Sequence, residues 1–325
     1  MKYLALATGL FAASSALAET PILTIYTYDS FDTEWGPGPA VEAAFEATCD
    51  CDLQFVAAGD GASVLARLKL EGARTEADVV LGLDNNLVAA ARETGLFTPT
   101  TARADYALPV AWKDDTFVPF DWGYFAFVKN ADLAAPSDFK ALGVSDLKVV
   151  IQDPRSSTPG LGLLMWVKSV YGDEAPAIWE GLSDNIVTVT KGWSEAYGLF
   201  LAGEADMVLS YTTSPAYHLI AEEDASKAAA AFTEGHYLQV EVAAKLASTD
   251  VPELADKFLA FMLTDAFQGV ISTTNWMYPA VTPAQGLPKG FETLISPDKA
   301  LMVPLADAPQ IREEALAEWL TALSQ

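Results

Sequence analysis

Apolar runs alternate with amphipathic stretches from residue 22 onward, in the order that an α/β protein shows. In the first third of the chain this pattern predicts strands at 22–28, 53–57 and 78–83, and helices at 40–47, 61–70 and 84–95. The third strand is almost continuously apolar, as a strand buried on both faces of a parallel sheet must be. We therefore expect a doubly wound, mostly parallel sheet with right-handed crossovers.

A second set of strands and helices follows in the other half of the chain. An Ala-rich surface helix is expected after residue 210, where alanines cluster. The remaining elements are predicted as strands at 149–151, 186–189 and 207–210, and as helices at 159–171, 175–182, 194–201, 252–270 and 311–323.

Two long strand-like runs, 117–128 and 235–243, connect the two sets of elements. This arrangement predicts two doubly wound α/β lobes joined by two hinge strands. We place residues 19–120 and 240–325 in the first lobe and residues 121–239 in the second. Two such lobes close by hinge bending over a ligand that touches both of them.

The first 18 residues have the composition of a secretory signal peptide. Lys2 precedes an apolar run at 3–13, and Ala16-Leu17-Ala18 forms a small-residue cleavage site. No later run is long and apolar enough to span a bilayer, so we expect an exported, soluble protein. The 19 basic and 44 acidic residues give a formal net charge of −25. This balance argues against a nucleic-acid partner, which needs clustered lysine and arginine.

The only cysteines, Cys49 and Cys51, stand in a Cys-Asp-Cys motif. An oxidising compartment favours a small-loop disulfide between them. A metal site, the alternative, would need further ligands, and the only histidines, His218 and His236, lie far along the chain. We expect the disulfide and neither a metal nor a cofactor.

Residues 152–162 form a hydroxyl-rich turn between a predicted strand and a predicted helix. Pro159 suits the first helical position, Thr158 can cap the helix, and Ser157 and Gly160 leave backbone N–H groups accessible. A helix start of this kind can hold an anion, or it can be an ordinary cap. Asp60 is a comparable candidate cap for the helix at 61–70.

Several aromatic residues fall in turns or at strand ends, where they more often line a site than fill a core. They are Tyr28, Trp35, Trp193, Tyr211, Tyr217 and Trp276. Aromatic faces together with an acidic residue such as Asp60 suit a flat organic cation, at about 0.5–2 kcal/mol per contact. A ligand with a cationic aromatic ring and a phosphate would match both these residues and the turn at 152–162.

Two other functions are compatible with parts of the sequence. Gly192-Trp-Ser-Glu-Ala196 is close to the nucleophile elbow of serine hydrolases, with Ser194 as nucleophile and Asp206 and His218 or His236 as partners. Ala196 departs from that motif and no oxyanion-hole motif is evident, so an ordinary helix start is favoured. The other alternative is a binder of a different organic cation, such as a polyamine.

The chain resembles the periplasmic thiamine-binding proteins of thiamine ABC importers over nearly its whole length after residue 18. Even the Cys-x-Cys pair matches. The stretches that carry the resemblance are LTIYTYDSF (23–31), WGPGP (35–39), ADVVLGLDNN (77–86), DTFVPFD (115–121), QDPR (152–155), STPGLG (157–162), TVTKGWSEAY (188–197), LSYTTSPAYH (209–218) and NWMYP (275–279).

The resemblance implies a type II periplasmic binding protein fold and a monomeric, non-enzymatic carrier in the periplasm. Its ligands would be thiamine, thiamine monophosphate and thiamine diphosphate, and its partner a membrane permease with an ATPase. It implies that the pyrimidine ring stacks between Tyr217 and Trp276, and that Tyr28 and Trp35 are cleft aromatics. The rest of the implied site comprises Asp60, Gly61, Ser157, Thr158, Trp193, Tyr211, Thr212, Thr213 and Ser214. Ala58-Gly59, just before Asp60, departs from the family pattern and bears on selectivity among the phosphorylated forms.

Overall fold

The computed structural model describes residues 20–323, so the predicted signal peptide at 1–18 lies outside the described residues. The main strands are β1 (Ile22–Thr27), β2 (Asp52–Ala57), β3 (Val79–Asp84), β5 (Val118–Asn130), β6 (Val149–Gln152), β7 (Ile186–Thr190), β8 (Met207–Tyr211) and β10 (His236–Leu246). Four short strands join them: β4 (Phe97–Thr98), β9 (Lys227–Ala229), β11 (Tyr278–Pro279) and β12 (Ala300–Leu301). These positions agree with most of the strands that the apolar runs predict.

The helices alternate with the strands, as the sequence pattern predicts. They are α1 (Gly38–Glu46), α2 (Gly61–Glu71), α3 (Val88–Arg92), α4 (Phe139–Gly143), α5 (Thr158–Tyr171), α6 (Ala175–Leu182), α7 (Trp193–Leu201), α8 (Pro215–Ala221), α9 (Pro252–Phe261), α10 (Asp265–Val270) and α11 (Ala308–Leu323). Within residues 20–323, none of the helices has the length and hydrophobicity that crossing a membrane requires.

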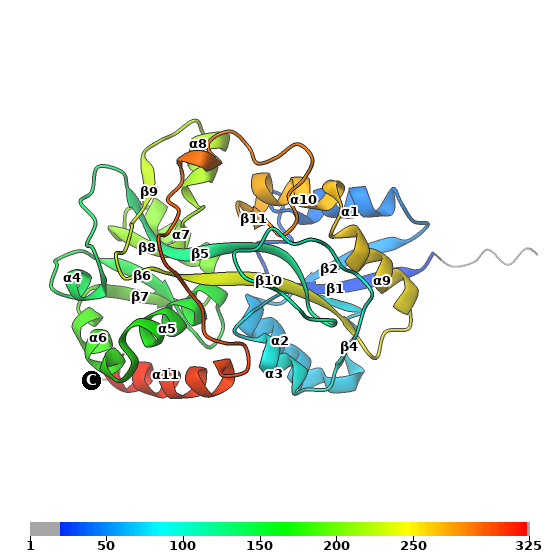
Figure 1. The fold of residues 1–325 in the computed structure, drawn as a ribbon, viewed down its shortest axis with the longest axis horizontal. Coiled ribbons are helices and arrows are strands. Elements are labelled where there is room, and N and C mark those ends of the chain that lie inside the picture. The colour runs from blue at the N-terminus through cyan, green and yellow to red at the C-terminus, as the bar shows by residue number, and fades with distance from the viewer. Residues whose placement is uncertain (1–19, 324–325) are drawn as a thin grey trace, which may run out of the picture.

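One twisted sheet runs through the molecule in the order β2-β1-β3-β10-β5-β8-β6-β7. The pairs β1–β2, β1–β3, β6–β7 and β6–β8 are parallel, whereas β10 is antiparallel to both β3 and β5. The long strands β5 and β10 therefore form the middle of the sheet and connect its two halves (Figure 1). This arrangement agrees with the predicted pair of connecting strands.

Helices cover both faces of each half of the sheet. In the first half, α1, α9 and α10 pack on one face around Phe45 and Phe258, and α2 and α3 cover the other. In the second half, α5 and α6 pack around Trp166, and α7 covers the opposite face. The residues that hold the site are thus anchored in buried apolar clusters.

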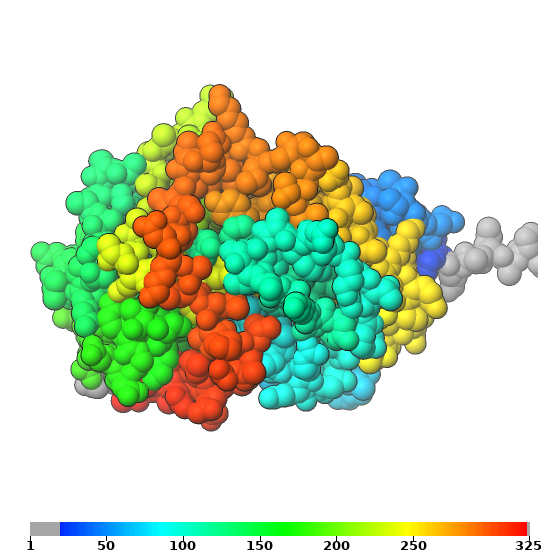
Figure 2. Space-filling model, in the orientation of Figure 1, coloured from blue at the N-terminus to red at the C-terminus, as the bar shows by residue number. Residues whose placement is uncertain are grey.

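The C-terminal helix α11 packs against α5 and α6, although the predicted boundaries placed residues 240–325 with the first lobe. Its buried Trp319 joins the large apolar cluster, and Lys168 of α5 forms an ion pair with Glu318 at 2.6 Å. The chain reaches this position through an extended segment that lies along the surface between the two halves (Figure 2). A third segment therefore passes between the halves, beside β5 and β10.

Two secondary-structure predictions were wrong. Lys227 and the two alanines after it form strand β9 rather than a helix, because β10 stops pairing with β5 at Tyr124 and leaves the edge of Val128–Asn130 free for another strand. The helix expected at 252–270 is two helices, because Thr264 adopts an extended conformation and Asp265 begins a new first turn.

The core around α5 provides a test of packing. A Cβ added to Gly162 would lie 2.0 Å from Cε2 of Phe125, so Gly162→Ala should lower the free energy of unfolding by about 1–3 kcal/mol. Gly181→Ala in α6 is the matched control, because an added Cβ meets nothing within 4 Å. That variant should gain about 0.5–1 kcal/mol. Urea unfolding checks both, and a Gly162→Ala variant as stable as wild type would contradict this packing.

Candidate functional site

A cavity of about 550 Å³ lies between the two halves of the molecule. Its lining combines aromatic rings with two carboxyl groups, those of Asp60 and Glu241. Within the described part of the chain, no lysine, arginine or histidine contributes to this lining. The cavity is therefore aromatic and acidic, which suits a flat ligand that carries a positive charge.

The structure places most of the predicted site residues on the cavity wall. These are Tyr28, Trp35, Asp60, Thr158, Trp193, Tyr211, Ser214, Tyr217 and Trp276. The lining does not include the other predicted residues, which are Gly61, Ser157, Thr212 and Thr213. The part that each residue plays in binding stays a prediction.

Asp60 connects the two halves at one end of the cavity. Its Oδ2 accepts a hydrogen bond from Ser157 Oγ at 2.6 Å and another from the backbone N–H of Trp193 at 3.2 Å. Close by, the backbone N–H of Gly61 donates to Thr158 Oγ1 at 3.2 Å. Residues from α2, α5 and α7 thus meet where the resemblance implies that the ligand's phosphate lies.

The predicted capping roles in this region were wrong. Asp60 precedes α2 and Ser157 precedes α5, yet neither side chain caps its own helix, and Thr158 is the first residue of α5. The side chains of Asp60, Ser157 and Thr158 bond across the two halves instead. The N-terminal N–H groups of α5 are therefore not capped by these hydroxyls. The N–H of Ser157, which was expected to be accessible, donates to the carbonyl of Asp153 at 2.9 Å.

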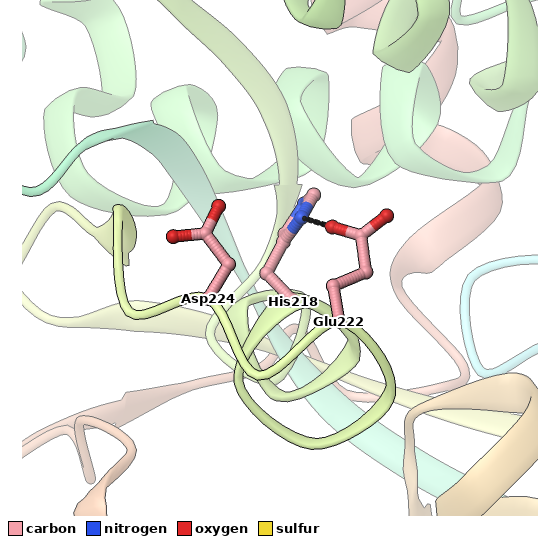
Figure 3. A group of neighbouring side chains, drawn as sticks. All are labelled: His218, Glu222 and Asp224. Atoms are coloured by element: carbon pink, nitrogen blue, oxygen red, sulfur yellow. Dashed lines mark hydrogen bonds and ion pairs between the residues drawn. The ribbon is translucent and has the colours of Figure 1, made fainter.

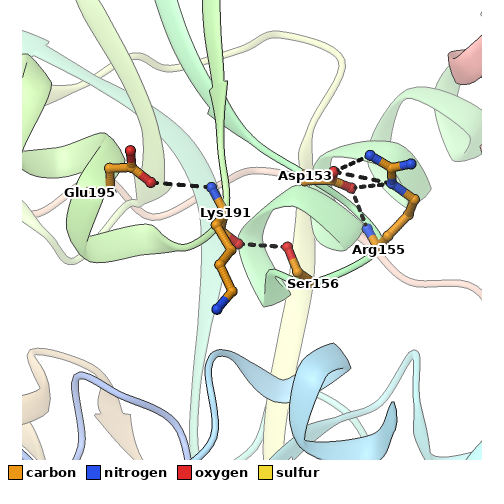
Figure 4. A network of polar contacts seen from close by, with 5 residues as sticks. All are labelled: Asp153, Arg155, Ser156, Lys191 and Glu195. Atoms are coloured by element: carbon orange, nitrogen blue, oxygen red, sulfur yellow. Dashed lines mark hydrogen bonds and ion pairs between the residues drawn. The ribbon is translucent and has the colours of Figure 1, made fainter.

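The turn that precedes α5 is fixed by the neighbouring turn after β7 (Figure 4). Ser156 Oγ donates to the carbonyl of Lys191 at 2.6 Å, and the N–H of Lys191 donates to Glu195 Oε2 at 3.3 Å. Arg155 forms an ion pair with Asp153, which lowers the pKa of that carboxyl. These bonds hold the two helix starts, and with them Thr158 and Trp193, at one end of the cavity.

The aromatic rings lie in two groups on the cavity wall. The Tyr217 and Trp276 rings have centroids 5.6 Å apart and an interplanar angle of 71°, so they meet edge to face. A ring stacked between them would need parallel faces roughly 7 Å apart, twice the carbon–carbon contact distance. One of the two side chains must therefore turn before a flat ring can enter. Trp193 stacks on Tyr197 and also approaches Trp35.

Trp276 has a backbone conformation that is uncommon for a residue with a side chain. Its φ of 56° lies in the left-handed region, at the end of the short π-helical turn Ile271–Asn275. Such a conformation costs of order 1–3 kcal/mol and persists where the surroundings impose it, often at binding sites. Here it places the indole ring on the cavity wall.

Sequence reasoning missed a polar network at the floor of the cavity. Tyr28 Oη donates to Glu241 Oε2 at 3.1 Å, and Asn275 Nδ2 donates to Tyr28 Oη at 2.9 Å and to Asp121 Oδ2 at 2.6 Å. Burial raises the pKa of Asp121 to about 7 and that of Glu241 well above its usual range. The only indication of this network in the sequence was one acidic residue within each of the two long apolar runs.

Ser194 lines the cavity, but no histidine serves it as a base. His218 Nε2 is 3.0 Å from Tyr197 Oη, and its Nδ1 is 2.6 Å from Glu222 Oε2. His236 is buried, where its Nδ1 lies 2.8 Å from the carbonyl oxygen of Phe125 and its Nε2 accepts from the N–H of Phe232. The two histidines are thus held by other groups, and the Ser-His-Asp arrangement is not assembled.

Among residues 20–323, one side-chain cluster has the composition of a metal site. His218, Glu222 and Asp224 offer ligand atoms that lie within 4.8 Å of one another (Figure 3). Both ring nitrogens of His218 already have partners, and Asp224 accepts from the N–H and Oγ of Ser226. The cluster is organised as a hydrogen-bond network. Cys49 and Cys51 form the expected disulfide.

Comparisons with known proteins agree in fold and in sequence. The family of bacterial extracellular solute-binding proteins matches residues 34–269. A thiamine-binding periplasmic protein of Escherichia coli (strain K12) is 56% identical over 310 residues, which cover 94% of each chain. One of Brucella suis biovar 1 (strain 1330) is 50% identical over the full length of both chains.

Solved structures show the same likeness. A periplasmic thiamin binding protein has a TM-score of 0.92 at 55% identity, covering 98% of this chain and 100% of that one. A ferric binding protein from Campylobacter jejuni has a TM-score of 0.76 at 18% identity, covering 92% and 99%, which shows a shared fold alone. The predicted type II periplasmic binding fold is confirmed.

The Asp60 carboxyl makes folding stability depend on pH. Burial raises its pKa to about 6, above the value of about 3.9 for an unfolded chain. Between these values the native state holds more protons, so this group's contribution to the free energy of unfolding falls as pH rises. Asp60 contributes up to about 1.4 kcal/mol per pH unit to the slope of the free energy of unfolding against pH, and this contribution should be absent in Asp60→Asn.

Urea unfolding of the ligand-free protein from pH 4 to pH 7 measures this slope. Asp153→Asn is the control, because the pKa of Asp153 is lowered by Arg155. The contribution of Asp153 to the free energy of unfolding is lost only as pH falls below about 4, which is outside the measured range. Equal slopes for Asp60→Asn and wild type would contradict the burial of Asp60 between the two halves.

Proposed function

Because the chain belongs to the family of bacterial extracellular solute-binding proteins, we propose that it captures thiamine in the cavity between its two halves. It acts in the periplasm and passes its ligand to the membrane permease of an ATP-driven importer. It is a binding protein and not an enzyme. The lining carries this proposal, since it offers aromatic faces and two carboxyl groups without a basic side chain.

The chemistry of thiamine matches this lining. Its pyrimidine ring is flat and can stack on Tyr217 or Trp276 once one of these rings turns. Its thiazolium ring is permanently positive, so aromatic faces and carboxylates attract it, at about 0.5–2 kcal/mol for each cation–π contact. A cavity of about 550 Å³ lies within the usual size range of small-molecule sites.

Thiamine monophosphate and thiamine diphosphate are further ligands in this proposal. Their phosphates would lie at the start of α5, where the helix dipole favours an anion. Ser157 Oγ and the N–H of Gly61 are additional donors, and they now bond to Asp60 and Thr158. A phosphate that enters here would exchange these contacts for its own.

Capture proceeds by closure of two lobes in a monomer. The proposed first lobe contains residues 19–120 and 240–307 and the second contains residues 121–239, with β5 and β10 as hinge strands. We place α11 with the second lobe because it packs on α5 and α6. The contacts of Asp60 with Ser157 and Trp193 support closure, because they join residues of the two lobes.

Calorimetry with thiamine tests the function directly. We expect saturable binding at micromolar ligand, and no saturation with a polyamine, which lacks the aromatic ring. Trp276→Ala should weaken thiamine binding by about tenfold, because it removes a stacking face worth roughly 1–2 kcal/mol. Trp276→Phe keeps a ring and should restore much of that loss. An unchanged affinity in Trp276→Ala would mean that the ligand lies elsewhere.

A double variant tests the phosphate end. Ser157→Ala with Thr158→Ala should weaken thiamine monophosphate by about tenfold and thiamine much less, since a hydrogen bond to a charged group contributes about 1.5–3 kcal/mol. Calorimetry with both ligands gives the comparison, and thiamine is the internal control. Equal losses for the two ligands would leave these hydroxyls with only a structural role.

A further inference from the structure

Two acidic side chains face each other across the hinge strands at the floor of the cavity. Asp121 of β5 and Glu241 of β10 are direct cross-strand partners, and their exposed fractions are 0% and 5%. Glu241 also lines the cavity. No basic side chain within residues 20–323 forms an ion pair with either carboxyl. A buried carboxylate without a cation is costly, so this arrangement calls for an explanation.

The hydrogen bonds of the pair are incomplete. Glu241 accepts from Tyr28 Oη and Asp121 Oδ2 accepts from Asn275 Nδ2, whereas Asp121 Oδ1 is buried without a partner. Burial raises the pKa of both carboxyls, and the charge of Asp121 raises that of Glu241 further, so near neutral pH the two are not both ionised and the pair holds one proton. The pair then holds a single negative charge beside the cavity.

Other titratable groups around the pair add no positive charge. Asp84 of β3 is the other cross-strand neighbour of Glu241, and its carboxylate accepts from the N–H groups of Asn86 and Leu87. The phenols of Tyr28 and Tyr211 are neutral, because burial raises the pKa of each well above its usual range. Arg312 stays positively charged, but its charge acts on Asp84 and not on Asp121 or Glu241.

We propose that Asp121 and Glu241, sharing one proton, form the anionic site that selects a ligand with a positively charged ring. This inference rests on the proposed function, because thiamine carries such a ring between its pyrimidine and its hydroxyethyl or phosphate end. The cavity lining contains a part for each: Tyr217 and Trp276 for the pyrimidine, Thr158 and Pro159 at the start of α5 for the phosphate end, and Glu241 for the charged ring. The ligand's charge compensates the pair, whereas a neutral ligand of equal shape leaves it unpaired.

Selection by charge then depends on pH. When pH falls far enough for a second proton to bind, the pair becomes neutral and its preference for a cation is lost. Conversely, binding of a cation lowers the proton affinity of the pair, so near neutral pH thiamine binding should release protons. The heat of binding should then vary with the ionisation enthalpy of the buffer.

The decisive comparison uses thiamine and its neutral analogue in which carbon replaces the thiazolium nitrogen. Both share the pyrimidine ring, so the titration of that ring cancels in the ratio of their affinities. At pH 8 wild type should bind thiamine about tenfold or more tightly than the analogue, because a close charge pair strengthens binding by at least that factor. The ratio of the two affinities should fall toward pH 5. A ratio near one at every pH overturns the inference even if no variant folds.

The double variant Glu241→Gln with Asp121→Asn identifies the pair, because either single change leaves one carboxyl group that can hold the charge. It should reduce thiamine affinity by about tenfold or more and leave the neutral analogue much less affected. Glu234→Gln is the control, since Glu234 bonds Tyr171 outside the cavity and should leave the ratio unchanged.

The outcomes separate the two proposals. If wild type binds neither thiamine nor the analogue, the proposed function is wrong. If wild type binds thiamine and the double variant weakens both ligands equally, the function stands and the two carboxyls have only a structural role. A preference for thiamine that the double variant retains would also overturn the inference.

Discussion

The antiparallel pairing of β5 with β10 is the interaction on which the rest of the structure depends. These are the strands that pass through both halves of the sheet, and their register places Asp121 beside Glu241. A slip of β10 by one residue would turn Glu241 to the opposite face and separate it from Asp121. The same pairing therefore joins the halves, forms the floor of the cavity and determines which charge the floor presents.

The remaining walls come from segments that the two halves bring together. Asp60 meets Ser157 and Trp193, and Tyr217 meets Trp276. Each contact joins parts of the chain that lie far apart in sequence, so neither exists until the halves come together. An acidic floor with aromatic walls then favours a flat cation, in agreement with the function of the relatives.

The sequence predicts most of the fold because buried strands of a parallel sheet leave continuous apolar runs, as at 78–83. It also predicts the cavity aromatics, since Trp193 and Tyr217 follow predicted strands and stand beside polar residues. Both residues lie in helices, α7 and α8, rather than in turns. Two features were beyond it. The partner of Ser157 is 97 residues away in Asp60, so it depends on how the halves meet. Asp121 and Glu241 lie within apolar runs, where a single acidic residue gives no indication of its neighbour on another strand.

The central claim is that the cavity holds a ligand with a cationic ring, and mass spectrometry of gently purified protein tests it most directly. Under non-denaturing conditions, protein from its native compartment should carry a mass increment equal to thiamine or one of its phosphates. The increment should disappear on denaturation, because the ligand is not covalently bound. A retained molecule without a cationic ring, or a protein that takes up no thiamine when it is supplied, would contradict the account.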